Sequence, residues 1–307
     1  MTTRPVVIQT EHLSPPAAAW LAERADLVVA APGSATFASA APDAEGLVVR
    51  TYTRVDDALL DRLPRLRVVA RAGVGLDNID QEACARRGIR VCNTPDANTQ
   101  AVVEYVLCLL CDTLRPRVLL DAPLDRARWD EVRAEIVGRR QMNELRLGIL
   151  GMGRIGRRVA QVAGAIGFEV EFCDLLEIPE ALRHGAFPVT AEDLFRHADV
   201  LTVHIDGRAA NRHLVGERLL GLLKPDAVLL NTSRGFVIDD RALARWLRAN
   251  PAAQAVLDVH DPEPFTAESP LLGLPNAHLA PHLASRTDAA MEAMSWVVKD
   301  AWAALRG

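Results

Sequence analysis

The 307-residue sequence has no long hydrophobic run, no excess of basic charge and no leader-like N-terminus. No apolar run reaches the roughly 18 residues that predict a membrane-spanning helix. The first residues, MTTRPVVIQT, enter a short apolar strand at once and contain no signal-peptide core. The net charge of −5 gives no general attraction to nucleic acid or anionic lipid. We therefore expect a globular cytoplasmic protein without nucleic-acid or membrane partners.

The cysteines form no disulfide or metal-site pattern. Cys108 and Cys111 make one C-x-x-C pair, but it falls on a helical pattern with no second pair and no nearby histidine. Buried thiols are favoured over a zinc or redox site, and no metal is predicted. The five cysteines all lie in apolar segments: Cys84, Cys92, Cys108, Cys111 and Cys173.

Half of the residues are hydrophobic, and the length is sufficient for two domains that each bury a core. Short apolar runs alternate with helical patterns, which predicts α/β architecture with parallel sheets. Residues 32–42 are expected to be a loop within the first domain. A long apolar helix is predicted from Asn98 to Arg115, with Glu104 as a paired interior acid. One amphipathic helix is expected over 287–305.

Residues 116–144 are rich in charge and poor in strand pattern, with Trp129 as their one large apolar side chain. They can be a flexible insert or an arm that packs on a second subunit, and we favour the arm.

A glycine-rich turn between two apolar runs gives the clearest functional signal. The segment Leu145 to Asp174 describes a strand, the turn Gly151-Met152-Gly153-Arg154-Ile155-Gly156, a helix, a second strand and an acid. Gly151 allows the sharp turn, Gly153 lets a pyrophosphate approach the backbone, and Gly156 lets the helix pack close to the strand. The helix start suits a phosphate. The pattern predicts dinucleotide binding, and the alternative is an ordinary glycine-rich turn.

Asp174 selects the kind of dinucleotide. A carboxylate at this place can accept the ribose hydroxyls of an adenosine and repels a 2′-phosphate. Leu175 and Leu176 follow it, with no arginine, so NAD is favoured over NADP.

Three further strand ends carry reactive groups, and ligands of parallel sheets bind at that edge. Arg234 can hold a carboxylate with its forked cation. His282 can exchange a proton with a substrate oxygen, and Glu263 would favour its charged form. Each has a structural alternative, a surface salt bridge for Arg234 and a loop histidine for His282. His260 and His278 are the competing histidines nearby.

Together these motifs resemble the NAD-dependent D-2-hydroxyacid dehydrogenases, over nearly the whole chain. They are RAGVGLDNID at 71–80, NTPDANTQAVVE at 93–104, GMGRIG at 151–156, NTSRG at 231–235, LDVHDPEP at 257–264 and PHLAS at 281–285.

The resemblance implies a role for each matching residue. The catalytic residues would be Arg234, Glu263 and His282, while Asp258 would hold the nicotinamide carboxamide. Ala72, Gly73, Val74 and Gly75 would offer backbone N–H groups to the substrate carboxylate. The other residues expected to touch the cofactor are Val74, Gly151, Gly153, Arg154, Ile155, Gly156, Asp174, Thr232 and Ser233.

The resemblance also implies two Rossmann-like or flavodoxin-like parallel-sheet domains with a cleft between them. Residues 1–97 and 286–307 would form the substrate domain. Residues 98–285 would form the NAD-binding domain, with a dimerisation arm around 116–144. A homodimer is therefore expected.

Within the family, the segments at 45–55 and 67–80 look most like D-3-phosphoglycerate dehydrogenases. Arg50 and Arg71 are then candidates to meet a substrate phosphate, and the alternative is pairing with acids such as Asp77. The regulatory C-terminal domains and serine site of many such enzymes are expected to be absent. One departure is His204-Ile205-Asp206-Gly207-Arg208, where the family commonly has His-x-Pro-Leu-Thr, so that Asp206 stands in place of the proline. It puts Ile205 in doubt as a cofactor contact.

The leading hypothesis is thus an oxidoreductase that transfers a hydride between NAD(H) and a D-2-hydroxy acid or 2-keto acid. The first candidate pair is 3-phosphoglycerate and 3-phosphohydroxypyruvate. Glyoxylate or hydroxypyruvate reduction and a phosphite-type dehydrogenase are alternatives on the same fold. A corepressor-like NAD-sensing binding module is the alternative of another class.

Overall fold

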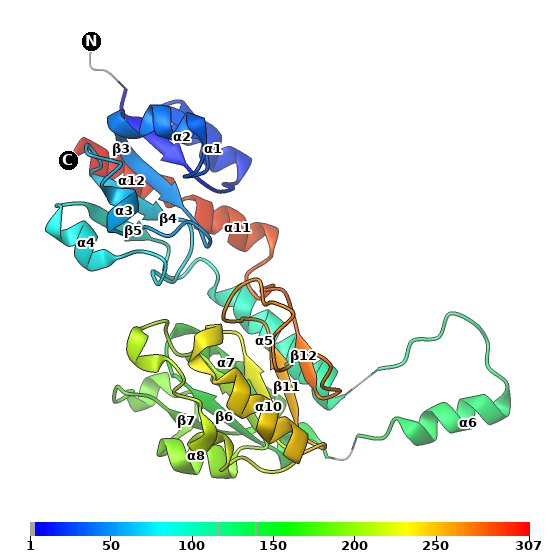
Figure 1. The fold of residues 1–307 in the computed structure, drawn as a ribbon. Coiled ribbons are helices and arrows are strands. Elements are labelled where there is room, and N and C mark those ends of the chain that lie inside the picture. Colours follow the sequence, from blue (N-terminus) through cyan, green and yellow to red (C-terminus); the bar gives the residue numbers. More distant parts are fainter. Residues whose placement is uncertain (1–3, 116, 139) are drawn as a thin grey trace. The chain divides into compact units, whose positions relative to one another are not determined.

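The computed structural model describes residues 4–115, 117–138 and 140–307. The chain folds into two compact units. Unit 1 contains residues 1–101 and 285–307, and unit 2 contains residues 102–284. Each unit is built on its own parallel sheet (Figure 1).

Unit 1 has a five-stranded parallel sheet in the order β2-β1-β3-β4-β5. Because β2 and β3 lie on opposite sides of β1, the loops after β1 and β3 diverge at a topological switch point. The strands are β1 (Val6–Gln9), β2 (Asp26–Val29), β3 (Ala44–Val49), β4 (Val68–Arg71) and β5 (Arg90–Asn93).

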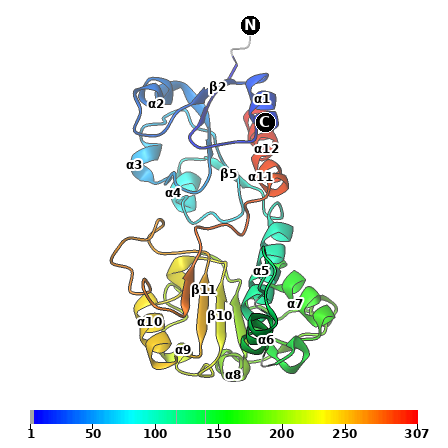
Figure 2. The same cartoon turned by 90° about the vertical axis from the view of Figure 1, so that its right-hand side faces the viewer.

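Helices cover both faces of this sheet (Figure 2). One core cluster contains Phe37, Leu60 and Cys84, from α2 (Ala35–Ala40), α3 (Asp57–Leu60) and α4 (Gln81–Arg86). The other contains Leu21 and Leu305, from α1 (Pro15–Ala22) and α12 (Val298–Arg306). Both chain ends therefore contribute to one core.

Two predictions for unit 1 are wrong. The segment 32–42 contains α2, because Ser34 caps it by accepting from the Phe37 N–H and Phe37 is fully buried. The helix expected over 287–305 is two, α11 (Asp288–Ser295) and α12. The break lets Val297 be fully buried while Trp296 packs edge-on against Trp20, with ring centroids 6.4 Å apart.

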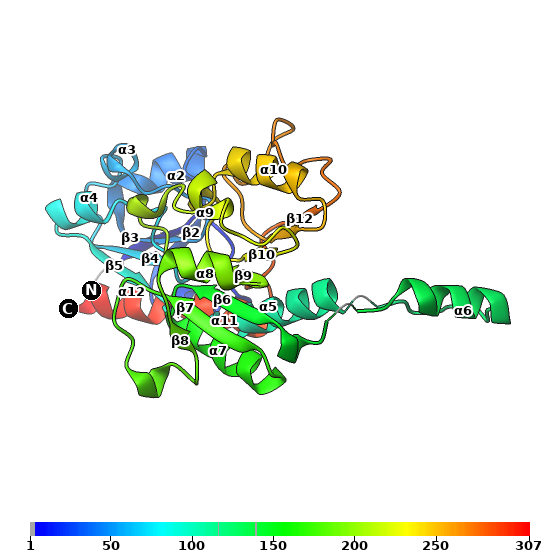
Figure 3. The same ribbon diagram turned by 90° about the horizontal axis from the view of Figure 1, so that it is seen from below.

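Unit 2 has a seven-stranded parallel sheet in the order β12-β11-β10-β9-β6-β7-β8. Figure 3 labels β12, β10, β9, β6, β7 and β8 in that succession. The glycine turn follows β6, whose neighbours β7 and β9 lie on opposite sides of it. The strands are β6 (Arg146–Leu150), β7 (Glu169–Cys173), β8 (Phe187–Pro188), β9 (Val200–Val203), β10 (Val228–Asn231), β11 (Gln254–Leu257) and β12 (Ala277–Leu279).

Two helix layers enclose this sheet. Helices α5 (Thr99–Leu114) and α7 (Arg154–Ile166) share one core cluster. Helices α8 (Ala191–His197), α9 (Glu217–Leu220) and α10 (Asp240–Ala249) share the other. Glu104 is exposed on α5 and not an interior acid, because Val102, Val103 and Val106 occupy the buried face.

The segment predicted to be an arm contains α6 (Arg126–Glu135), in which no residue is buried. Cys108, expected to be buried, is exposed on α5, and all five cysteines are free. Among the described residues, no helix is long and apolar enough to cross a membrane.

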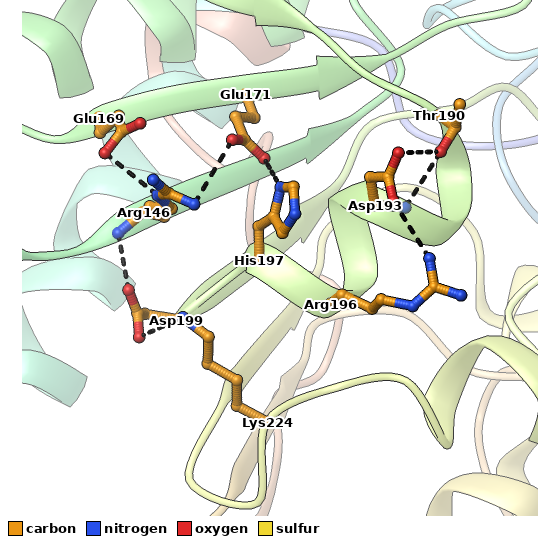
Figure 4. Close-up of polar contacts among 9 residues, drawn as sticks. All are labelled: Arg146, Glu169, Glu171, Thr190, Asp193, Arg196, His197, Asp199 and Lys224. Carbon is orange, nitrogen blue, oxygen red and sulfur yellow. Dashed lines mark hydrogen bonds and ion pairs between the residues drawn. The ribbon is translucent and has the colours of Figure 1, made fainter.

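A network of charged side chains lies at the amino ends of the unit 2 strands (Figure 4). Asp199, whose side chain is 5% exposed, accepts from Lys224 Nζ at 3.0 Å, Arg140 Nη1 at 2.7 Å and the Arg146 N–H at 2.8 Å. Burial alone would raise the pKa of Asp199, but these donors outweigh it and lower that pKa. Glu171 pairs with His197 at 3.0 Å in the same network.

Asp199→Ala should lower the free energy of unfolding by about 2–3 kcal/mol at pH 7, because it leaves buried donors unpaired. The pKa of Asp199 is lower in the folded protein than in the unfolded chain, where it is about 3.9. The contribution of Asp199 to the free energy of unfolding is therefore complete above that unfolded value. It is lost as the pH falls through the folded value. Urea unfolding at pH 7 and in the acid range measures both effects.

The matched control is Asp193→Ala, whose ion pair with Arg196 is exposed in the same region (Figure 4). Its loss of stability should be much smaller. Equal losses for the two variants would contradict the account of Asp199.

Candidate active site

The glycine turn after β6 is tightly packed at two of its three glycines. Gly151 has a φ of +98°, and a Cβ there would lie 2.8 Å from the His204 backbone. A Cβ on Gly156 would lie 2.1 Å from the Gly151 carbonyl oxygen. Gly153 begins α7 without a side-chain cap, and a Cβ there would meet nothing within 4 Å. The turn therefore leaves open space at the start of a helix, where a phosphate fits.

Asp174 lies beside this turn at the end of β7. Its carboxylate accepts from the Met152 N–H at 2.6 Å and the Leu176 N–H at 2.9 Å, one bond to each oxygen. Each oxygen keeps a further lone pair, so the fixed carboxylate suits the two hydroxyls of a ribose. Leu175 is 82% exposed beside it.

The loop after β10 is held by a buried asparagine. Asn231 Oδ1 accepts from the Ser233 N–H and hydroxyl at 3.0 and 2.8 Å, and its Nδ2 donates to the Arg234 carbonyl at 3.0 Å. Thr232 Oγ1 is buried without a partner among the described residues. Such an atom is costly unless a ligand satisfies it, so the loop fits a bound nicotinamide dinucleotide.

Asp258, directly after β11, is fully buried and holds the turn that follows His282. Its two oxygens accept from the Leu283 N–H at 2.7 Å and the Ala284 N–H at 2.8 Å. Burial raises the pKa of Asp258, and burial likewise raises that of the Tyr105 hydroxyl, which hydrogen-bonds to this carboxylate, to about 12. The predicted contact to a carboxamide remains a prediction.

Glu263 and His282 form a hydrogen-bonded pair. His282 Nδ1 lies 2.9 Å from Glu263 Oε2, and His282 has a φ of +56°, which is uncommon for a residue with a side chain. Because an ionised carboxylate only accepts, Nδ1 carries the hydrogen and Nε2 remains to face a ligand. Burial alone would raise the pKa of Glu263, but the bond and charge of His282 and the His260 N–H outweigh it and lower that pKa.

The competing histidines occupy other places. His278 lies exposed on β12. His260 donates its backbone N–H to Glu263 Oε1 at 2.9 Å, and its ring Nε2 lies 2.8 Å from the carbonyl oxygen of Ala280. His204, at the end of β9, bonds to Thr202 Oγ1, and burial lowers its pKa to about 3, so it stays neutral near pH 7.

In the unusual loop after β9, the carboxylate of Asp206 is hydrogen-bonded to side chains of the same loop. Asp206 accepts from Arg208 Nε at 2.7 Å and Asn211 Nδ2 at 3.0 Å. The Arg208 bond offsets burial and lowers the pKa of Asp206. Ile205 packs on the glycine turn, since a Cβ on Gly151 would lie 2.9 Å from Ile205 Cγ2.

In unit 1, the loop after β3 wraps around a carboxylate from the loop after β1. Glu11 accepts four backbone N–H groups, from residues 50, 51, 52 and 53, at 2.9 to 3.1 Å. These bonds outweigh burial and lower the pKa of Glu11. They fix the loop that carries Arg50.

Two arginines of unit 1 meet at one sulfur atom. Arg50 Nη2 lies 3.0 Å and Arg286 Nη1 lies 4.0 Å from Met291 Sδ. Burial and the nearby Arg286 charge lower the pKa of Arg50. Within the described part of the chain, neither guanidinium has a carboxylate at ion-pair distance. The pair is therefore suited to an anionic ligand.

In the loop after β4, two backbone N–H groups already donate hydrogen bonds within the protein. The Ala72 N–H donates to Val49 O at 2.9 Å and the Gly73 N–H to Arg71 O at 2.8 Å. Four N–H groups of this loop were predicted to face the substrate carboxylate, and those of Val74 and Gly75 are the two that remain for this role. The Arg71 side chain lies against this loop, as a Cβ placed on Gly73 would be only 1.7 Å from Arg71 Nη1.

The structure thus brings together the hydrogen-bonded Glu263–His282 pair and Asp258, which holds the turn directly after His282. They lie at the edge of the unit 2 sheet that also carries the glycine turn, Asp174 and Arg234. Sequence reasoning missed Asn231 and Glu11. The sequence spacing, with Asn231 three residues before Arg234, could have indicated the asparagine. Only the three-dimensional contacts identify Glu11.

Comparisons with known proteins give the family. Residues 107–284 match the family model described as D-isomer specific 2-hydroxyacid dehydrogenase, NAD binding domain. A glyoxylate reductase of Aeropyrum pernix is 38% identical over 293 residues, which cover 92% of this chain and 88% of the relative. The chain belongs to this family. It is an NAD-dependent oxidoreductase that acts on the CH–OH group of 2-hydroxy acids.

Two further relatives show how far the likeness extends. A D-3-phosphoglycerate dehydrogenase of Mycobacterium tuberculosis is 34% identical over 94% of this chain, which spans only 54% of that relative. A crystal structure of a D-lactate dehydrogenase from Aquifex aeolicus, complexed with NAD and lactic acid, has a TM-score of 0.84 at 26% identity. It covers 98% of this chain and 96% of that one. The dehydrogenase family is therefore established, and the names of its members give different substrates.

Proposed function

We propose that the chain reduces a 2-keto acid to a D-2-hydroxy acid with NADH, and that 3-phosphohydroxypyruvate is the first candidate substrate. The observation that carries the proposal is the Glu263–His282 pair at 2.9 Å, at the carboxyl edge of a sheet with a dinucleotide turn. A carboxylate-oriented imidazole is the usual device for giving a proton to a carbonyl oxygen.

The proposed residues divide the reaction between them. Arg234 binds the substrate carboxylate, and His282 donates the Nε2 proton to the carbonyl oxygen. Glu263 accepts from Nδ1 and stabilises the imidazolium before the transfer. The nicotinamide supplies the hydride. In the oxidising direction, neutral His282 takes the hydroxyl proton.

The preference for a phosphorylated substrate rests on Arg50 and Arg286. Two guanidiniums held around a neutral sulfur repel each other, and an anion bound between them would offset that repulsion. A keto acid with a second anionic group supplies that anion. Glyoxylate is the second candidate, since the 38% identical relative is a glyoxylate reductase.

The test is consumption of NADH by the purified protein with 3-phosphohydroxypyruvate, hydroxypyruvate and glyoxylate, followed by absorbance. We expect the highest kcat/KM with 3-phosphohydroxypyruvate. Faster turnover of glyoxylate would replace the first candidate with the second. No turnover of any keto acid would overturn the proposed function.

Arg286→Ser should raise KM for 3-phosphohydroxypyruvate about 10-fold, because one charge-assisted contact of about 1.4 kcal/mol is lost. It should leave KM for glyoxylate unchanged, since glyoxylate has no second anionic group. Arg65→Ser is the control, because Arg65 pairs with Asp43 on the exposed surface of the same unit. Equal effects on both substrates would refute the anion contact.

We further propose a cytoplasmic homodimer formed through the arm. Leu119 is 91% and Val137 70% exposed there, and Trp129 is half exposed. Sedimentation of the intact protein tests the dimer, and a monomer at all concentrations would contradict it.

A further inference from the structure

The segment after β11 contains a histidine that none of the proposed steps uses. The His260 backbone N–H donates to Glu263 Oε1 at 2.9 Å, while Glu263 Oε2 bonds to His282. Both oxygens of the carboxylate are therefore fixed, one by His260 and one by the proposed acid.

The imidazole of His260 reaches the other side of the pair. Its Nε2 lies 2.8 Å from the Ala280 carbonyl oxygen, two residues before His282. A carbonyl only accepts, so Nε2 carries the hydrogen. The ring also packs edge-on against Phe265, with centroids 4.6 Å apart. One residue thus ties the Glu263 segment to the His282 segment.

The same residue contacts the loop of Arg234. A Cβ on Gly235 would lie 2.0 Å from the His260 carbonyl carbon and 2.4 Å from its Cα. The backbone of His260 therefore packs directly on the residue after Arg234. The three proposed catalytic residues lie on three segments, and His260 contacts each segment.

We propose that His260 is a positioning residue, which sets the geometry between Glu263 and His282 through its Nε2–H bond to Ala280. The expected effect on kcat rests on the proposed function, whereas the structural role of His260 does not. At metal sites, hydrogen bonds that orient the ligands typically contribute about 10- to 100-fold to activity, and we expect an effect of that order here.

Other charged groups face these rings. Glu263 and Asp258 act on His282, and Glu263 and Asp240 act on His260. Burial raises the pKa of Asp240, at the start of α10, to about 6, although His260 opposes this. Because the Asp240 charge also acts on His260, the readout is the difference between the pH profiles of the variant and the wild type.

The test compares His260→Phe with His260→Gln. Phenylalanine keeps a ring against Phe265 but removes the N–H, whereas glutamine offers an amide N–H to Ala280. We expect His260→Phe to lower kcat about 10-fold and to move the pH profile of kcat/KM, with NADH affinity within about twofold. His260→Gln should recover kcat to within about threefold. His278→Phe, an exposed histidine of β12, is the matched control and should change nothing.

Histidine NMR separates failure of this proposal from failure of the proposed function. In His260→Phe the resonance of the His282 Nδ1–H proton should move upfield or broaden, because its hydrogen bond to Glu263 is displaced. That shift supports the positioning role even if no keto acid is turned over. An unchanged His282 Nδ1–H resonance in folded His260→Phe, or a lowered melting temperature with unchanged kcat and pH profile, would overturn the proposal.

Discussion

Replacing His282 by asparagine should lower kcat by about 10³-fold with any keto acid that the wild type reduces, because no other group of the pair can donate the proton. Asparagine is chosen because it tolerates the φ of +56° at this position. NADH affinity, measured by fluorescence titration, should stay within about threefold, since the proposed role of His282 is toward the substrate oxygen.

The control for this variant is His278→Asn on the exposed part of β12. It should retain wild-type turnover. If His282→Asn turned over normally, the acid–base assignment would be wrong. If it lost NADH binding and its fold together, the residue would be structural.

The second large effect concerns the glycine turn. Gly156→Ala places a Cβ 2.1 Å from the Gly151 carbonyl oxygen, which is backbone and cannot move aside cheaply. We expect a loss of stability of about 3 kcal/mol or more, measured by urea unfolding. Gly153→Ala meets nothing within 4 Å and has a φ of −74°, so it should fold like the wild type.

Gly153→Ala should instead lower NADH affinity about 10-fold or more, because its Cβ occupies the space expected for the pyrophosphate. The two variants thus separate the packing role of one glycine from the binding role of the other. Normal NADH affinity in Gly153→Ala would contradict the phosphate site. Normal stability in Gly156→Ala would contradict the close contact.

The α/β fold could be predicted because local patterns determine it. The strand–turn–helix–strand of 145–174 depends on residues close in sequence, and the structure has β6, α7 and β7 there. The errors arose where distant contacts decide. Phe37 forms a helix within an expected loop because a core is available to bury it. The C-terminal helix breaks where Trp296 meets Trp20, nearly three hundred residues away in sequence.

In the candidate site, too, local sequence motifs predicted some residues, and contacts between distant residues decided the others. Glu263 and His282 were predicted from motifs, and the structure adds their hydrogen bond. Residues that act through backbone atoms give no such signal. Glu11 binds four amides of a loop about forty residues away, and His260 was considered only as a competing catalytic histidine. Their partners are backbone N–H and C=O groups, which nearly every residue type has, so composition and spacing cannot identify them.

The most direct test is the distance from His282 Nε2 to the ligand oxygen in a crystal structure with NADH and oxamate, an unreactive analogue of a 2-keto acid. We expect about 2.6–3.2 Å between Nε2 and the amide oxygen that replaces the ketone, with the oxamate carboxylate on Arg234. Oxamate bound with its carboxylate away from Arg234, and no ligand oxygen within hydrogen-bond reach of His282, would contradict the account.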